Sequence, residues 1–208
     1  PDRSLKFAVV SFVIPVINAG TTATVSLVEA PCAEHATGLS APEMLDPEMN
    51  FDTEIELSGI TTETISARTM LKEGAFRYWL QGPIVTAVII EDRTPARHHD
   101  VALGQGDRML HPIVEAWFYP GMTNVEIGAA LENCWASSYA TNSMKSIAYA
   151  MNLWGGETNR VLHASESTFT DHGRTRWHRR FWLQGHPPGV VIDYNLPYLT
   201  STRFIANY

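Results

Sequence analysis

Residues 76–92 read FRYWLQGPIVTAVIIED, an aromatic segment followed by Gly-Pro and a run of β-branched residues. Proline restricts the backbone to an extended or turning conformation, and aromatic and β-branched residues favour strands. The stretch is therefore predicted to form two strands joined near Gly82, and residues 84–90 are apolar enough to be buried on both faces. A similar order, RFWLQGHPPGVVID, returns at residues 180–193, where Trp-Leu-Gln-Gly is repeated after 182 − 79 = 103 residues.

Strand-like segments recur along the rest of the chain, and none sustains the 3.6-residue period of an amphipathic helix. They alternate apolar and polar residues or are rich in β-branched and aromatic types, with turn residues between them. This spacing predicts an all-β fold with little helix, an antiparallel β-sandwich rather than a βαβ fold. The further predicted strands are residues 6–17, 21–29, 51–57, 62–71, 111–119, 124–132, 144–153, 160–165, 174–183 and 189–193.

The repeated Trp-Leu-Gln-Gly leaves two domain organisations open. The chain forms one large supersandwich over residues 1–208, or it forms two related parts. In the second case residues 1–134 make one half, with an N-terminal hairpin that turns at Asn18-Ala19-Gly20 and a long loop over residues 30–50. Residues 135–208 then make the second β part. A short helical turn is expected within the long loop, around residues 41–45.

Charge and hydropathy limit the classes of partner. The chain has 208 residues, a formal net charge of −7 and a pI near 5.6, so no nucleic acid partner is expected. No stretch approaches the roughly 18 apolar residues of a membrane span, because Ser11 and Pro15 interrupt residues 7–17. The chain begins at Pro1 rather than at Met, which is typical of a processed or excised product.

The two cysteines, Cys32 and Cys134, permit two interpretations. They are buried or half-buried thiols, or they form one disulfide, which would indicate an oxidising compartment. No Cys-x-x-Cys spacing is present, which argues against c-type haem and structural zinc. No cofactor is expected.

Residues 171–182, DHGRTRWHRRFW, form the richest polar segment. On a strand, Arg174, Arg176, His178 and Arg180 share one face. Guanidinium groups pair with carboxylates and aromatic rings stack on sugar rings, so this row of cations beside tryptophans predicts binding of an acidic glycan. The predicted glycan-binding residues are three tryptophan platforms, two arginines as carboxylate partners and one histidine: Trp79, Trp177, Trp182, Arg176, Arg180 and His178.

Two other interpretations of this segment stay open. The cations and aromatic rings would also suit the neutralisation and stacking of single-stranded nucleic acid. Alternatively, the segment is a solvated face whose arginines pair with Glu or Asp of neighbouring strands while its aromatic residues pack inward.

The stretch over residues 91–107 holds residues of the types that bind metals. Asp92, Asp100 and Asp107 are candidate oxygen ligands for calcium, but their spacing is not that of an EF-hand loop, and an exposed polar loop is the alternative. His98 and His99 are adjacent, so on an extended backbone at most one of them would join a site.

Catalytic motifs are missing from the sequence. It contains no Gly-x-Ser-x-Gly elbow, no phosphate-binding glycine loop and no His-Glu-x-x-His. The chain by itself is therefore not expected to be an enzyme.

Residues 81–88 (QGPIVTAV), 116–121 (AWFYPG) and 125–127 (VEI) follow one another in a pattern that resembles β-sandwich regions of large secreted bacterial proteins. Those regions are similar to the supersandwich parts of polysaccharide lyases and to the galactose-mutarotase-like fold. Trp177, Phe181-Trp182 and residues 196–199 (LPYL) extend the resemblance over the last two thirds of the chain. No catalytic residue is carried over, so the resemblance implies a sandwich module of a sugar-handling or cell-surface protein.

Taken together, these features predict a non-catalytic β-sandwich module, structural or carbohydrate-binding, of an extracellular or cell-surface protein. Its partners would be a polysaccharide or other copies of the chain in a homo-oligomer. Two alternatives are an accessory domain of a polysaccharide lyase or glycoside hydrolase, and a subunit of an extracellular filament or shell that assembles through its β-strand edges.

Overall fold

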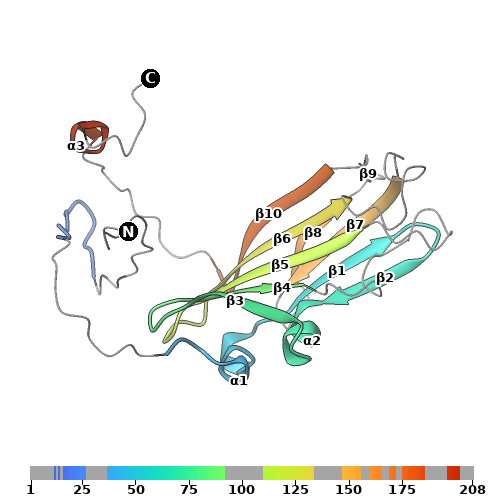
Figure 1. Ribbon diagram of the computed structural model, residues 1–208, viewed down its shortest axis with the longest axis horizontal. Helices are drawn as coiled ribbons and strands as arrows, with labels where there is room; N and C mark the ends of the chain where they lie inside the picture. Colours follow the sequence, from blue (N-terminus) through green and yellow to red (C-terminus); the bar gives the residue numbers. More distant parts are fainter. Residues whose placement is uncertain are drawn as a thin grey trace, which may run out of the picture.

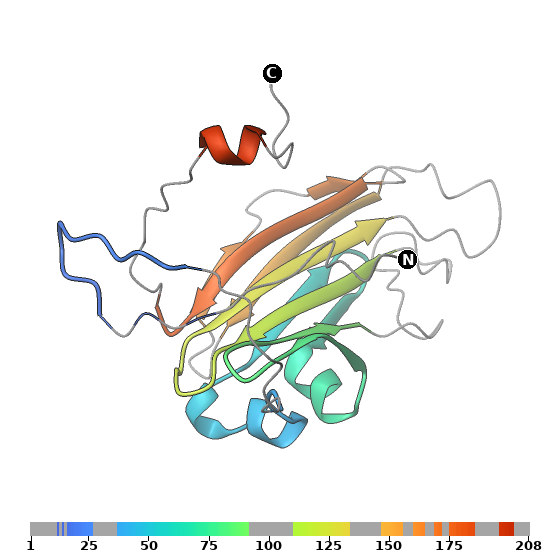
Figure 2. The same cartoon turned by 60° about the vertical axis from the view of Figure 1, so that its left-hand side comes forward.

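The chain folds into two antiparallel β-sheets packed face to face, as the computed structural model shows (Figures 1 and 2). The structure describes residues 12, 14, 16–26, 37–91, 110–133, 147–155, 160–164, 169–171, 175–185 and 196–201. Within these residues, the predicted all-β sandwich with little helix is confirmed. None of the helices in this part of the chain has the length and apolar character needed to cross a membrane.

We name the two layers sheet A and sheet B. Sheet A consists, in spatial order, of β2 (Thr62–Ser66), β1 (Thr53–Ser58), β7 (Ile147–Gly155) and β8 (Arg160–Ala164), with β9 (Phe169–Asp171) also paired to β7. Sheet B consists of β10 (Thr175–Leu183), β6 (Val125–Asn133), β5 (His111–Phe118), β4 (Thr86–Ile90) and β3 (Phe76–Gln81). Segments before and after residue 134 contribute strands to both sheets.

The hydrophobic core lies between the two sheets because their strands turn alternate side chains inward. From sheet B, Phe118, Ile127 and Leu131 are fully buried, and from sheet A, Leu57 and Met151 are fully buried. Phe51, just before β1, joins this core, and its ring meets that of Phe118 edge to face with the centroids 5.1 Å apart.

Residues 76–92 form the predicted pair of strands, β3 and β4. The backbone N–H of Gly82 donates a hydrogen bond to the carbonyl oxygen of Val85 at 3.1 Å, which closes the turn between the strands. Residues 85–88 and Ile90 are buried, whereas Ile84 and Ile89 are half-buried, so the predicted burial on both faces is confirmed for most of residues 84–90. Sheet B therefore has its apolar strand β4 next to its edge.

The repeated Trp-Leu-Gln-Gly lies at the two opposite edges of sheet B. Its first copy ends β3 and its second ends β10, so the first strand of each copy is confirmed. The second copy leaves its strand through Gln184 and Gly185, whose φ angles are +59° and +98°, whereas Gly82 in the first copy has no positive φ. Residues 189–193, the predicted second strand of the later copy, lie outside the described residues.

The other strand predictions in the middle and end of the chain are confirmed by β1, β5, β6, β7, β8 and β10 within the described residues. The turn at Pro120-Gly121-Met122 joins β5 to β6, and the backbone N–H of Met122 donates to the carbonyl oxygen of Tyr119 at 2.9 Å. Gly121 has a φ of +79°, a conformation that glycine adopts without strain.

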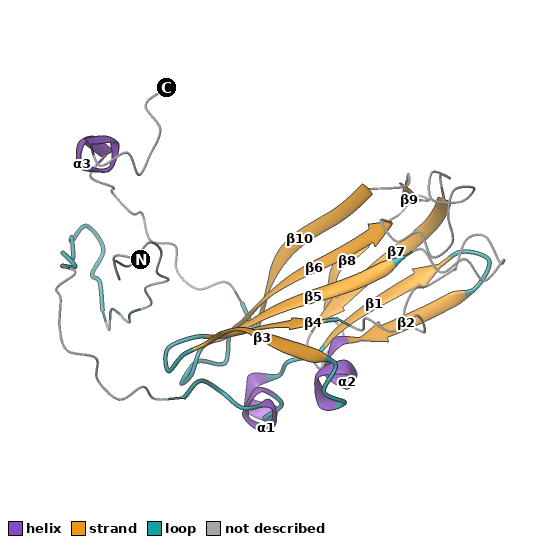
Figure 3. Cartoon of the chain, in the orientation of Figure 1, coloured by secondary structure: helices purple, strands orange, loops and turns teal. Residues whose placement is uncertain are grey.

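The strand predicted over residues 62–71 is correct only as far as Ser66. Residues Ala67–Lys72 form the helix α2 instead. Ser66 caps this helix, because its side-chain oxygen accepts a hydrogen bond from the Thr69 backbone N–H at 3.1 Å. Ala67 and Leu71 lie four residues apart on the buried side of α2, which contacts β1 of sheet A and β4 of sheet B. The helix thus covers one open edge of the sandwich (Figure 3).

The strands predicted at the start of the chain are wrong for the residues that the structure describes there. The turn at Asn18-Ala19-Gly20 is confirmed, and the Thr21 N–H donates to the Asn18 carbonyl oxygen at 3.1 Å. Residues 16, 17 and 21–26 are not strands, and their side chains are exposed. β-Branched residues favour a strand only where a partner strand and a packed face are available, and this segment has neither within the described residues.

The predicted helical turn in the long loop is confirmed as α1 (Ala41–Met44), which is followed by the 3-10 turn η1 (Pro47–Met49). The segment just before α1 is bound to the β3–β4 hairpin. The Leu39 N–H donates to Thr86 Oγ1 at 2.8 Å, and the Tyr78 hydroxyl donates to the Leu39 carbonyl oxygen at 3.2 Å. The hairpin is therefore held through a side chain of each of its two strands. The remaining helix, α3 (Leu196–Ser201), is near the C-terminus (Figure 3).

Candidate functional site

The outer face of sheet B, the side turned away from sheet A, carries an unusual set of aromatic and charged side chains. The register of β10 on β6 pairs Phe181 with the buried Ile127, so Arg176, His178, Arg180 and Trp182 alternate to the outside. Of the tryptophans that the structure describes, Trp79, Trp117 and Trp182 lie on this face.

Trp79 occupies a β-bulge in the edge strand β3. Tyr78 pairs with Val88 and Leu80 with Ala87, so Trp79 has no partner of its own on β4. A bulge re-aims a side chain, and bulges are common next to functional sites. The Trp79 side chain is 67% exposed although it is large and apolar. Packing within the sandwich does not explain why such a large apolar side chain is exposed.

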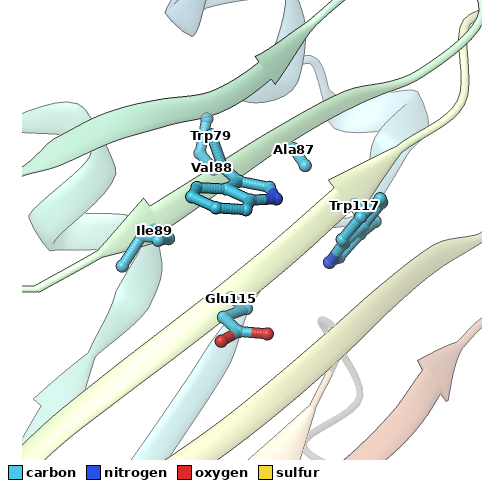
Figure 4. A pocket seen from close by; sticks show the side chains of 6 residues that line it. All are labelled: Trp79, Ala87, Val88, Ile89, Glu115 and Trp117. Carbon is cyan, nitrogen blue, oxygen red and sulfur yellow. The ribbon is translucent and has the colours of Figure 1, made fainter. Parts of the chain in front are cut away.

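A shallow pocket of about 270 Å³ lies between Trp79 and Trp117. Figure 4 shows the Trp79 indole reaching from β3 across β4 toward the strand that carries Glu115 and Trp117. Ala87 and Ile89 of β4 contribute to the lining. Because neighbouring strands lie about 4.8 Å apart, β3 and β5 are roughly 10 Å apart, which leaves space for one flat ring between their side chains.

Of the described residues that line this pocket, Glu115 is the one with a carboxylate. The residue opposite it on β6 is Gly128. A β-carbon on Gly128 would lie 3.3 Å from Glu115 Oε2 and 3.2 Å from His178 Nε2. Because Gly128 has no side chain, the Glu115 carboxylate and the His178 imidazole both have room beside it.

The arginines of this face are paired with glutamates of neighbouring strands. Arg180 Nη1 donates to Glu126 at 2.9 Å, and its Nη2 lies 3.8 Å from Glu115 Oε2. Arg176 Nε lies 3.4 Å from Glu132. This pairing agrees with the alternative interpretation of residues 171–182 as a solvated face whose arginines pair with carboxylates of neighbouring strands. The Arg180 guanidinium also lies 5.9 Å from the centroid of the Trp117 ring.

Trp182 extends the aromatic surface at the end of β10. Its ring stacks on that of Tyr119, with centroids 5.9 Å apart and planes inclined by 21°. The Tyr119 hydroxyl donates to Glu126 Oε2 at 3.4 Å. Burial and then the nearby Glu126 carboxylate raise the pKa of Tyr119 above its ordinary value, so the phenol stays neutral at physiological pH.

Trp177 does not join this face. It is half-buried against the core between the sheets, and its ring lies 5.1 Å from the imidazole of His163 on β8. Burial, followed by repulsion from Arg179, lowers the pKa of His163. Of the six predicted glycan-binding residues, the structure thus places Trp79, Arg176, His178, Arg180 and Trp182 on one face and turns Trp177 to the other side.

Several predicted site residues lie outside the described residues: Cys32, Cys134, Asp92, His98, His99, Asp100 and Asp107. Among the residues that are described, no group of three or more His, Cys, Asp or Glu side chains could hold a metal ion.

Glu115 and Trp117 were not among the residues predicted from the sequence. Both alternate with buried residues of β5 and therefore point to the outer face. The apolar–polar alternation within residues 111–119 was the signal that places them on one side of a strand.

Comparisons of the chain with protein-family models, with curated proteins and with solved structures give no match. The fold and the site together define the class of protein. It is an antiparallel β-sandwich with an aromatic pocket on the outer face of one sheet.

Proposed function

We propose that this protein is a non-catalytic carbohydrate-binding β-sandwich module of an extracellular or cell-surface protein, and that sugar binds on the outer face of sheet B. The observation that supports this most strongly is the bulged, 67% exposed Trp79, which faces Trp117 across a shallow pocket. A large apolar ring held in water at a bulge has a cost that a ligand stacked on it would offset.

The chemistry of the pocket suits a sugar ring. One face of a pyranose is a patch of C–H groups that packs on an indole, while its rim of hydroxyl groups requires hydrogen-bond acceptors. Trp79 and Trp117 supply the indoles, and Glu115 supplies a carboxylate that accepts hydrogen bonds. Ligand pockets commonly combine such an apolar lining with few polar groups that fix orientation.

The ion pairs on this face weigh against an acidic glycan. Arg176 and Arg180 lie within 4 Å of Glu132 and Glu126 respectively, so an acidic sugar would have to displace these carboxylates. Displacement would leave a glutamate without its partner, which costs part of the energy gained from the new pair. We therefore propose that the ligand is a sugar without carboxylate groups.

Alanine at Trp79 tests the proposal. We expect the wild-type protein to bind at least one neutral or basic polysaccharide, and Trp79→Ala to weaken that binding at least tenfold, about 1.4 kcal/mol. Affinity electrophoresis in polysaccharide gels selects the ligand, and isothermal titration calorimetry with its oligosaccharides measures the affinity. The fold is expected to persist, because an exposed side chain contributes little to stability.

The matched control for this experiment is Trp154→Ala. Trp154 lies on β7 opposite Glu54, next to the inward-facing Leu153, so it belongs to the outer face of sheet A. Binding in this variant is expected to equal that of the wild type. Equal binding by the wild type and Trp79→Ala, or no binding to any polysaccharide of the panel, would contradict the proposed function.

A further inference from the structure

The charges around the pocket do not balance. Arg180 is shared between two carboxylates, at 2.9 Å from Glu126 and 3.8 Å from Glu115. The closer partner, Glu126, takes the hydrogen bond. Among the described arginine, lysine, aspartate and glutamate side chains, one guanidinium thus faces two carboxylates at the pocket, and the carboxylate left in excess is that of Glu115.

Elsewhere on the outer face each described arginine has a glutamate beside it. Arg176 lies 3.4 Å from Glu132, and Arg77 lies 3.3 Å from Glu91. Neither pair includes a residue of the pocket lining. The guanidinium that is shared between two carboxylates thus lies beside the pocket that the two indoles line.

Two indole faces and a carboxylate attract the same kind of group. The π-face of tryptophan is negative and attracts cations, most strongly where water is partly excluded. Glu115 is partly shielded from solvent, with 29% of its side chain exposed, so its charge is less screened than that of a fully exposed glutamate. A ligand whose ring stacks on an indole and whose positively charged substituent lies beside Glu115 would use these groups together.

We infer that the pocket formed by Trp79, Glu115 and Trp117 recognises a sugar with a free, protonated amine, as in a polymer of glucosamine. This inference rests on the proposed function and names its ligand class. The sugar ring stacks on an indole, and its ammonium group pairs with Glu115. N-Acetylation removes the charge and adds bulk at the same atom, so it removes the ammonium–carboxylate pair and leaves the stacking.

The test compares three oligosaccharides of equal length, made of glucosamine, N-acetylglucosamine and glucose. Calorimetry is done at one pH at which titration of the free oligomer shows the amines to be protonated. We expect the glucosamine oligomer to bind at least tenfold more tightly than the other two. All ligands are compared at the same pH.

Glu115→Gln then assigns the preference to the carboxylate. The substitution keeps the shape of the side chain and removes its charge, so we expect the glucosamine oligomer to lose about tenfold in affinity while the two neutral oligomers bind as before. Glu132→Gln is the matched control, since Glu132 is on the same face, is paired with Arg176 and does not line the pocket. Thermal unfolding of both variants accompanies the titrations.

The possible outcomes separate this inference from the function on which it rests. Equal affinity for glucosamine and glucose oligomers, with both lost in Trp79→Ala, would overturn the amine preference and leave carbohydrate binding intact. A preference for glucosamine that survives in Glu115→Gln would also overturn the inference. No binding of any of the three would count against both. The wild-type comparison decides the first case even if Glu115→Gln does not fold.

Discussion

Replacing Phe118 with alanine is expected to lower the free energy of unfolding by about 3–5 kcal/mol. Phe118 is fully buried at the end of β5, and its ring meets that of Phe51 with the centroids 5.1 Å apart. Its removal takes away apolar burial, breaks the edge-to-face contact and leaves a cavity that the two sheets fill only in part. Urea denaturation followed by circular dichroism measures the change.

Ile113→Ala is the control for Phe118→Ala. Ile113 lies on the same strand, but it is half-buried and alternates to the outer face of sheet B. Its truncation removes less buried surface and opens no cavity between the sheets, so the loss should be clearly smaller. Equal losses in the two variants would show that the core does not lie between the sheets at Phe118.

Alanine at Arg68 is expected to cost about 2–3 kcal/mol of stability, because hydrogen bonds from a charged donor are stronger than neutral ones. The guanidinium of Arg68, on α2, donates to the Phe51 carbonyl oxygen at 2.8 Å and to the Leu45 carbonyl oxygen at 2.9 Å. It thereby ties α2 to the segment between α1 and β1. Thermal and urea unfolding measure the loss.

Arg68→Lys separates the forked geometry from the charge. Lysine keeps the positive charge but lacks the planar fork that reaches two carbonyl groups at once, so we expect it to recover only part of the stability. Wild-type stability in Arg68→Lys would indicate that one contact or the charge alone is sufficient. Wild-type stability in Arg68→Ala would contradict the bridging role.

The sequence predicts strands well where a strand has partners. Alternation within residues 111–119 and 124–132 is confirmed by β5 and β6, which lie in the middle of sheet B. Residues 67–71 show why α2 was missed. Ala67 and Leu71 are four residues apart, a spacing that puts them on one side of either a strand or a helix, and the cap at Ser66 decides for the helix. Residues 16, 17 and 21–26 are the opposite case, because they have strand propensity but no partner strand among the described residues.

The candidate site was predictable only in part. Strand parity correctly groups Arg176, His178 and Arg180, and the same parity places Trp177 on the other side. The pocket itself depends on which strands are neighbours, since Trp79 and Glu115 come from β3 and β5 with β4 between them. It also depends on the bulge at Trp79, a local change of register that strand alternation does not reveal.

The most direct test of sugar binding at this pocket is an NMR titration that follows the indole N–H signals of the tryptophans, assigned by single substitution. With an increasing concentration of the oligosaccharide that binds best, the signals of Trp79 and Trp117 are expected to shift together along one binding curve, while that of Trp154 on sheet A stays in place. Unchanged Trp79 and Trp117 signals at saturating ligand, or a shift confined to Trp154, would contradict the assignment of the binding site to the outer face of sheet B.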